Sequence, residues 1–174
     1  MISLKIVGVI LIIISCYLYG EIAYEKLNSR LIGLKELHKV GRMLKANIRH
    51  TGSDIEEVLQ DTVTRVRNEV QEFIKEVVQQ IKTREVANIS FIWNEAITNN
   101  FKNIRFSEEE LIVIKRLGEN LGYMDKEMQI ENIELYLHEL EEKIEILLFE
   151  LRQKRKLYRT LSVSIGLFIV LIMV

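Results

Sequence analysis

The sequence predicts an all-α protein, an antiparallel bundle of about six helices flanked by N- and C-terminal transmembrane helices. Its 174 residues include no proline, and the abundance of Leu, Ile, Glu and Lys favours helix throughout the chain. Apolar residues recur at intervals of three and four across the middle of the chain, which is the period of a helix. Each end of the chain is a long apolar run.

The apolar ends divide the chain into three parts. Residues 1–20 are predicted to be an N-terminal transmembrane helix, residues 21–156 a cytosolic helical bundle, and residues 157–174 a C-terminal transmembrane helix. No charge lies between Ile6 and Tyr19, and neither apolar run alternates as a half-buried strand would.

Each end has an alternative interpretation that the sequence leaves open. The first run also fits a cleaved signal peptide, and Ile13 to Cys16 resembles a lipobox, whose processing would acylate Cys16. The second run also fits a buried core helix. Cys16 is the one cysteine of the chain, so no intramolecular disulfide is expected.

Basic residues lie on the inner side of both runs. Lys26, Arg30 and Lys35 follow the first run. Five basic residues flank the second run, namely Arg152, Lys154, Arg155, Lys156 and Arg159. By the positive-inside rule, we expect the middle of the chain in the cytosol and both short termini outside.

The first helices of the bundle follow from the apolar period and its interruptions. Residues 27–48 keep a helical period and continue the first apolar run without a linker. Ser53 and Glu56 form a predicted capping box that begins the second helix. Asn68 is the expected boundary between the second helix and the third.

The later helices are bounded by similar signals. The helical period resumes over residues 89–104, and Ser107 with Glu110 forms a second predicted capping box ahead of the fifth helix. The last helix carries a heptad seam, which predicts one long helix that runs into the C-terminal apolar run. An intramolecular bundle face and a dimer zipper both fit this seam, which consists of Ile130, Ile133, Leu137, Leu140, Ile144, Leu147 and Leu151.

Two glycines one turn apart predict a tight turn between the last two helices. We expect Gly122 to end the fifth helix in a left-handed conformation and Asp125 to cap the sixth. Gly118 faces the same side, and its missing side chain is expected to let the sixth helix approach closely near its start. Gln129 is expected to bond the backbone of the turn, with a solvated glutamine as the alternative.

The sequence shows no pattern of residues that indicates catalysis. His38, His50 and His138 are scattered without partners at metal-ligand spacing, and no glycine-rich phosphate loop follows a strand. The net charge of −1 does not favour nucleic-acid binding. We therefore expect a protein that is not an enzyme and has no cofactor, metal or small-molecule substrate.

Acidic residues concentrate on the last helix before its basic end. They fit either a solvated face followed by a membrane-anchoring collar, or a docking surface for a basic partner. On the second interpretation, the partner-binding candidates are Glu134, Glu141 and Glu145.

Five segments carry a resemblance to a known family. They are the N-terminal apolar run, MLKANIRHTGSDIEEVL, FIWNEAI, LGENLGYMDKEMQIENI and RQKRKLYRTLSVSIGLFIVLIMV, which begins with the basic run. Together they make the chain resemble, over its full length, the stage III sporulation protein AB family of endospore-forming bacteria. The chain departs from the usual family pattern after Gly52, where Ser53-Asp54 stands in place of a proline and leucine.

The resemblance implies a fold and a role. The family's soluble domain is similar to the helical cytoplasmic domains of platform proteins in type II secretion and type IV pilus systems. A member would lie in the mother-cell membrane facing the forespore, with its soluble domain in the cytosol. Its implied partners are the stage III sporulation AA-type ATPase and the other membrane components of the same channel complex. A Cys16-tethered scaffold outside the cell and an unrecognised enzyme are the competing hypotheses.

Overall fold

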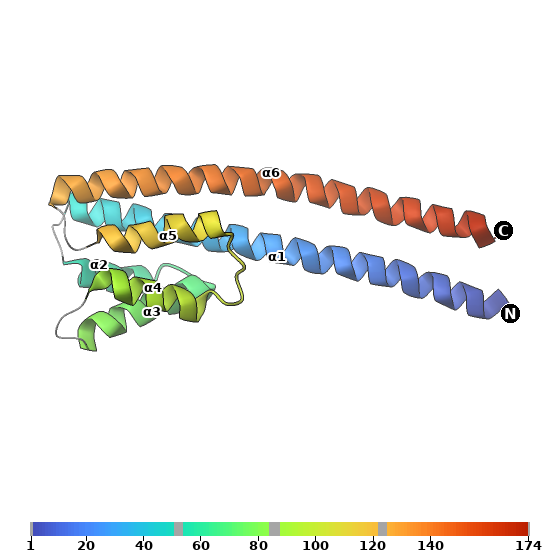
Figure 1. The fold of residues 1–174 in the computed structure, drawn as a ribbon, viewed down its shortest axis with the longest axis horizontal. Helices are drawn as coiled ribbons and strands as arrows, with labels where there is room; N and C mark the ends of the chain where they lie inside the picture. The colour runs from blue at the N-terminus through green and yellow to red at the C-terminus, as the bar shows by residue number, and fades with distance from the viewer. Residues whose placement is uncertain (1, 51–53, 84–87, 122–124, 174) are drawn as a thin grey trace. The chain divides into compact units, whose positions relative to one another are not determined.

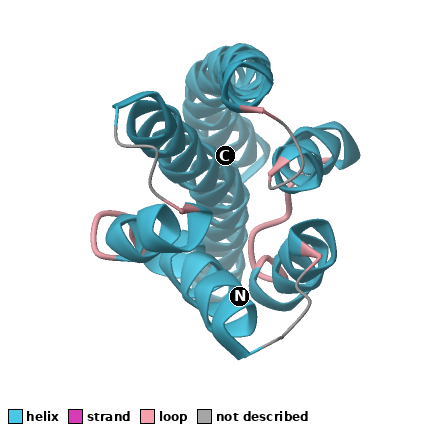
Figure 2. Cartoon of the chain, turned by 90° about the vertical axis from the view of Figure 1, so that its left-hand side faces the viewer, coloured by secondary structure: helices cyan, strands magenta, loops and turns pink. Residues whose placement is uncertain are grey.

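The computed structural model describes residues 2–50, 54–83, 88–121 and 125–173, and within these ranges the regular structure is all helical (Figures 1 and 2). The described helices are α1 (Ile2–His50), α2 (Ile55–Val63), α3 (Asn68–Thr83), α4 (Ile89–Asn100), α5 (Glu108–Asn120) and α6 (Lys126–Met173). The predicted all-helical fold is thus confirmed for the described residues.

The chain forms two compact units. The terminal unit comprises Met1–Ser29 and Ile146–Val174, and the bundle unit comprises Arg30–Glu145. α1 and α6 each continue from one unit into the other without a break in the helix.

Among the described residues, no helix offers a stretch that is both long enough and apolar enough to cross a bilayer. The membrane spans expected at residues 1–20 and 157–174 stay predictions, as do the domain boundaries drawn from them.

The bundle unit has an aromatic centre. The rings of Phe73 and Trp93 meet edge to face with centroids 4.7 Å apart, and Phe101 continues the cluster from Phe73 to Phe106. α3 packs against both α2 and α4, and α4 packs against α5. Burying each of these large side chains stabilises the fold by roughly 1.5–3 kcal/mol.

The first and last helices complete this core. The predicted stripe of α1 is fully buried at Leu34, Leu37, Val40 and Leu44. The heptad seam of α6 is buried at Ile133, Leu137, Leu140, Leu147 and Leu151, with Ile130 and Ile144 half-buried. Ile133, Leu137 and Leu140 are therefore part of the intramolecular core of the bundle unit, whereas Leu147 and Leu151 belong to the terminal unit.

Local signals set the helix ends. The capping box predicted at Ser107 and Glu110 is present, with the Ser107 side chain and the Glu110 side chain each accepting the other's backbone N–H. α2 begins differently, because its N-cap is Asp54 and Ser53 lies outside the described residues. Asn68 begins α3 with φ of 55°, a left-handed conformation that asparagine tolerates better than most residues.

Three glycines lie in close contact with aromatic side chains. A Cβ added to Gly33 would come within 2.8 Å of the Phe106 ring, and one on Gly41 within 2.8 Å of the Tyr136 ring. On Gly118, a Cβ would lie 2.2 Å from Trp93 Cγ. These glycines let α1 and α5 approach their neighbours more closely than any larger residue would allow.

Two buried polar side chains of the bundle unit, Glu110 and Tyr136, have hydrogen-bond partners. Glu110 is 3% exposed, and its carboxylate accepts from Arg30 Nη2 at 2.8 Å and from Arg30 Nε at 3.3 Å. The hydroxyl of Tyr136 donates to the backbone carbonyl of Leu37 at 3.3 Å, and burial raises the pKa of Tyr136. Such pairing offsets the cost of removing these groups from water.

Candidate functional site

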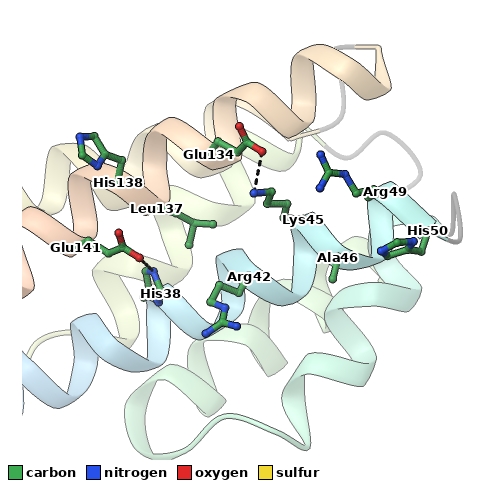
Figure 3. Close-up of a pocket in the computed structure, with 10 residues that line it drawn as sticks. All are labelled: His38, Arg42, Lys45, Ala46, Arg49, His50, Glu134, Leu137, His138 and Glu141. Atoms are coloured by element: carbon green, nitrogen blue, oxygen red, sulfur yellow. Dashed lines mark hydrogen bonds and ion pairs between the residues drawn. The ribbon is translucent and has the colours of Figure 1, made fainter.

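A groove of about 470 Å³ lies between α1 and α6 in the bundle unit (Figure 3). We call it the α1–α6 groove. α1 contributes His38, Arg42, Lys45, Ala46, Arg49 and His50, and α6 contributes Glu134, Leu137, His138 and Glu141. Most of its side chains are titratable, which separates it from the apolar core beside it.

Helical spacing positions these side chains. On α1, residues 38, 42, 45 and 49 follow one another at intervals of four, three and four, so they share one face. On α6, Glu134, His138 and Glu141 do the same. The buried stripe of each helix lies beside this face, so packing of the core brings the two charged faces together.

One ion pair and one hydrogen bond cross the groove, as the dashed lines of Figure 3 show. Lys45 Nζ lies 2.8 Å from Glu134 Oε1, and His38 Nε2 lies 3.0 Å from Glu141 Oε1. The hydrogen bond from Lys45 holds the pKa of Glu134 below its usual range, and the charges of Lys45 and Arg49 act in the same direction.

These contacts bear on the acidic residues of α6 that were expected to bind a partner. Glu134 and Glu141 both lie opposite bases of α1, although they remain 48% and 61% exposed. Glu145 is exposed. Their role in binding a partner stays a prediction, and two of the three carboxylates already have a partner within the chain.

Two ion pairs join another face of α6 to α5. Arg116 pairs with Glu139, and Lys143 pairs with Glu109. The hydrogen bond from Lys143, with its charge, lowers the pKa of Glu109. Acidic residues of α6 thus divide between two neighbouring helices and form no single uniform surface.

Asp125 lies at the start of α6, where a cap was expected. Its Oδ1 accepts from the backbone N–H of Glu127 at 2.8 Å and of Met128 at 3.2 Å. Gln129 is half-buried in the first turn of α6. The turn that Gln129 was expected to bond, including Gly122, lies outside the described residues.

Gly118 corrects one expectation. The sequence suggested that its missing side chain makes room for the sixth helix. The structure instead places Trp93 of α4 nearest to it, with Trp93 Cβ at 2.5 Å from an added Cβ. The indole Nε1 then donates to the carbonyl of Ile114, one turn earlier on α5, at 2.9 Å.

The basic residues near the C-terminal apolar run lie in the terminal unit. Arg152 is exposed, and Lys154 lies 3.7 Å from Glu150 one turn before it. The side chains of Arg155, Lys156 and Arg159 lie outside the described part of the structure. Their predicted contact with a membrane surface is therefore still a prediction.

The groove itself was missed by sequence reasoning. His38, His50 and His138, which are scattered in the sequence and are the chain's three histidines, all line it. A partial signal existed, since residues 38, 42, 45 and 49 recur at helical spacing. Within the described residues, no cluster of histidine, cysteine or carboxylate side chains is arranged to hold a metal ion.

Comparisons with known proteins place the chain beside one family. The family described as stage III sporulation protein AB matches residues 5–174. A solved structure titled stage III sporulation protein AB is 19% identical in sequence, and the alignment covers 66% of this chain and 89% of that chain with a TM-score of 0.60. That likeness shows a common helical fold. No curated protein sequence matches the chain.

Proposed function

Because the chain belongs to the stage III sporulation protein AB family, we propose that it is a membrane-anchored, non-enzymatic platform of the channel complex between mother cell and forespore. Family membership makes it a stage III sporulation component. The observation that carries the proposal is the extent of the match, which runs from residue 5 to residue 174 and so includes both apolar ends.

The chemistry of the bundle unit supports a binding role over a catalytic one. Its buried carboxylate, Glu110, holds Arg30 and caps α5. Its groove carboxylates hold bases of α1. These charged groups have partners within the chain, and Glu134 and Glu141 also keep 48% and 61% of their side-chain surface exposed to another protein.

The proposed topology has the bundle unit in the cytosol and both termini outside. The basic residues on the inner side of each apolar run support it. In a Cys16→Ser background, a cysteine at Asn99, which is exposed on α4, should resist membrane-impermeant thiol reagents in intact cells. A cysteine at Ile2 should react. Ready labelling at position 99 would instead support a scaffold tethered outside the cell.

We further propose that exposed carboxylates of α6 contact the AA-type ATPase of the same complex. Reversing Glu134, Glu141 and Glu145 to lysine should weaken capture of the purified ATPase while far-ultraviolet circular dichroism stays unchanged. The difference should shrink as salt rises, because exposed charges are screened beyond about 10 Å at 0.1 M.

A matched control separates a local surface from overall charge. Glu57, Glu72 and Glu119 are exposed on α2, α3 and α5, and their reversal changes the net charge equally. Capture should survive that reversal. Equal capture by both triple variants would show that the acidic residues of α6 are only a solvated face.

A further inference from the structure

The α1–α6 groove carries more positive than negative charge. Its bases are Arg42, Lys45 and Arg49, and its carboxylates are Glu134 and Glu141. Lys45 and His38 already hold the two carboxylates. Within the described residues no ion pair joins Arg42 to a carboxylate, so its guanidinium keeps its donors for another group.

The cations are spread along the groove. Arg42 and Arg49 lie on one face of α1, separated by two helical turns, or about 10 Å. Figure 3 shows Arg42, Lys45, Arg49 and His50 following one another along α1. In Figure 3 the guanidinium groups of Arg42 and Arg49 point in different directions from α1. Two carboxylates on one peptide therefore suit them better than a single small anion.

Apolar atoms complete the surface. Leu137 and Ala46 line the groove between the charged residues. They offer contact to aliphatic side chains or methylene groups, which a phosphate ion lacks. The guanidinium fork also matches a carboxylate with two parallel hydrogen bonds.

We propose that the α1–α6 groove binds an acidic segment of a partner protein, with two carboxylates about two helical turns apart that pair with Arg42 and Arg49. Glu134 and Glu141 oppose this binding by their charge and by occupying Lys45 and His38. Glu134 and Glu141 are also two of the carboxylates proposed to contact the ATPase, so the two contacts would compete for the groove. The peptide test contains no ATPase and does not depend on that contact.

The test uses the full-length chain in mild detergent and a fluorescent alanine-based helical peptide with glutamates seven positions apart. Fluorescence anisotropy at low salt measures the dissociation constant. A peptide with lysine in place of each glutamate is the probe control and should bind at least about tenfold more weakly, because like charges then face each other.

Two pairs of variants locate the binding. Arg42→Glu with Arg49→Glu should weaken binding of the acidic peptide at least about tenfold. Lys102→Glu with Arg105→Glu makes the same change in net charge at exposed residues outside the groove, and it should change binding less than about twofold. Glu134→Gln with Glu141→Gln should strengthen binding.

Three results would overturn the proposal. The first is absence of acidic-peptide binding even at low salt. The second is an equal loss in the two charge-reversal pairs, which would indicate general attraction to net charge. The third is displacement of the peptide by inorganic phosphate or ATP at concentrations below that of competing unlabelled peptide, which would assign the groove to a small anion.

Discussion

Replacing Gly118 with alanine tests the close approach of α5 to Trp93 of α4. The new Cβ would lie 2.2, 2.4 and 2.5 Å from Cγ, Cδ1 and Cβ of Trp93. All three atoms are near the backbone of α4, and Trp93 is fully buried. The clash cannot be relieved by moving the tip of a flexible side chain, so α4 or the whole indole must shift by about an ångström to restore van der Waals contact.

That shift has two costs and one gain. Overpacking of a core contact costs about 1–3 kcal/mol. Moving the indole also breaks the hydrogen bond from Trp93 Nε1 to Ile114, and a buried donor without a partner costs about 1–3 kcal/mol more. Alanine regains about 1 kcal/mol of helix propensity over glycine. The free energy of unfolding should therefore fall by about 3 kcal/mol in Gly118→Ala, and by more in Gly118→Leu.

The assay follows the chain's single tryptophan, Trp93, whose emission reports on this contact directly. Urea unfolding of a fragment covering residues 27–151 gives the stability, and the emission of the folded state should move to longer wavelength as the indole loses its burial. Glu119→Ala, at the next, exposed position of α5, is the matched control and should change stability by less than about 0.5 kcal/mol.

A double-mutant cycle then isolates the pair. In a Trp93→Ala background, which removes the opposing ring, Gly118→Ala should become neutral or stabilising. Parental stability and unchanged emission in Gly118→Ala alone would refute the argument. A space this small cannot accept a methyl group without a measurable change in stability or in Trp93 emission.

Three other perturbations follow from the contacts of α1, α5 and α6. Glu110→Ala removes both the cap of α5 and the partner of Arg30, and should lower stability in urea by roughly 3 kcal/mol; a loss below about 1 kcal/mol would mean that the pair is dispensable. Tyr136→Phe deletes one buried hydrogen bond and should cost about 1 kcal/mol, with a cost near zero contradicting the bond. Lys45 lowers the pKa of Glu134, so their pairing stabilises the fold fully above the ordinary glutamate value of 4.5 and is lost as the pH falls through the lower folded value. Lys45→Gln should therefore lower stability at neutral pH and leave it unchanged at the acid end of a pH series, and equal loss at both ends would contradict the assignment.

Local patterns predicted the helices well because their causes are local. The apolar period predicted a continuous α1, the absence of proline allowed it, and the Ser107 capping box predicted the start of α5. The start of α2 at Asp54 was placed one residue early, at Ser53, since either residue type can cap a helix. The membrane spans expected at the two ends stay predictions, because no helix among the described residues is both long and apolar enough to cross a bilayer.

Contacts between distant helices were harder to predict. Gly118 was recognised as a point of close approach, but its partner was assigned to α6 when it is Trp93 of α4. A glycine in a helix indicates that another part of the chain packs closely against it, but only the tertiary structure shows which residue that is. Gly33 and Gly41 meet Phe106 and Tyr136 in the same way, and no local pattern linked these pairs.

The groove is the clearest case of this limit. Each of its two faces could be predicted from the spacing of its residues, His38 to Arg49 on α1 and Glu134 to Glu141 on α6. Whether the two faces lie opposite each other depends on how α1 and α6 align along their axes. A shift of one turn would exchange every pair, and charge patterns alone do not choose among such alignments.

The contacts between α1 and α6 also have a consequence for how the chain folds during synthesis. The hydroxyl of Tyr136 bonds the Leu37 carbonyl across 99 positions, and His38 meets Glu141 across 103. During synthesis, α1 emerges long before the helix that covers Leu37 and Gly41. The face of α1 that α6 will cover thus stays open until nearly the whole chain has left the ribosome, and closing it requires the longest loop in the bundle unit. Completion of this domain is consequently a late event, and a nascent chain that stops before α6 exposes apolar side chains of α1 that are buried in the complete fold.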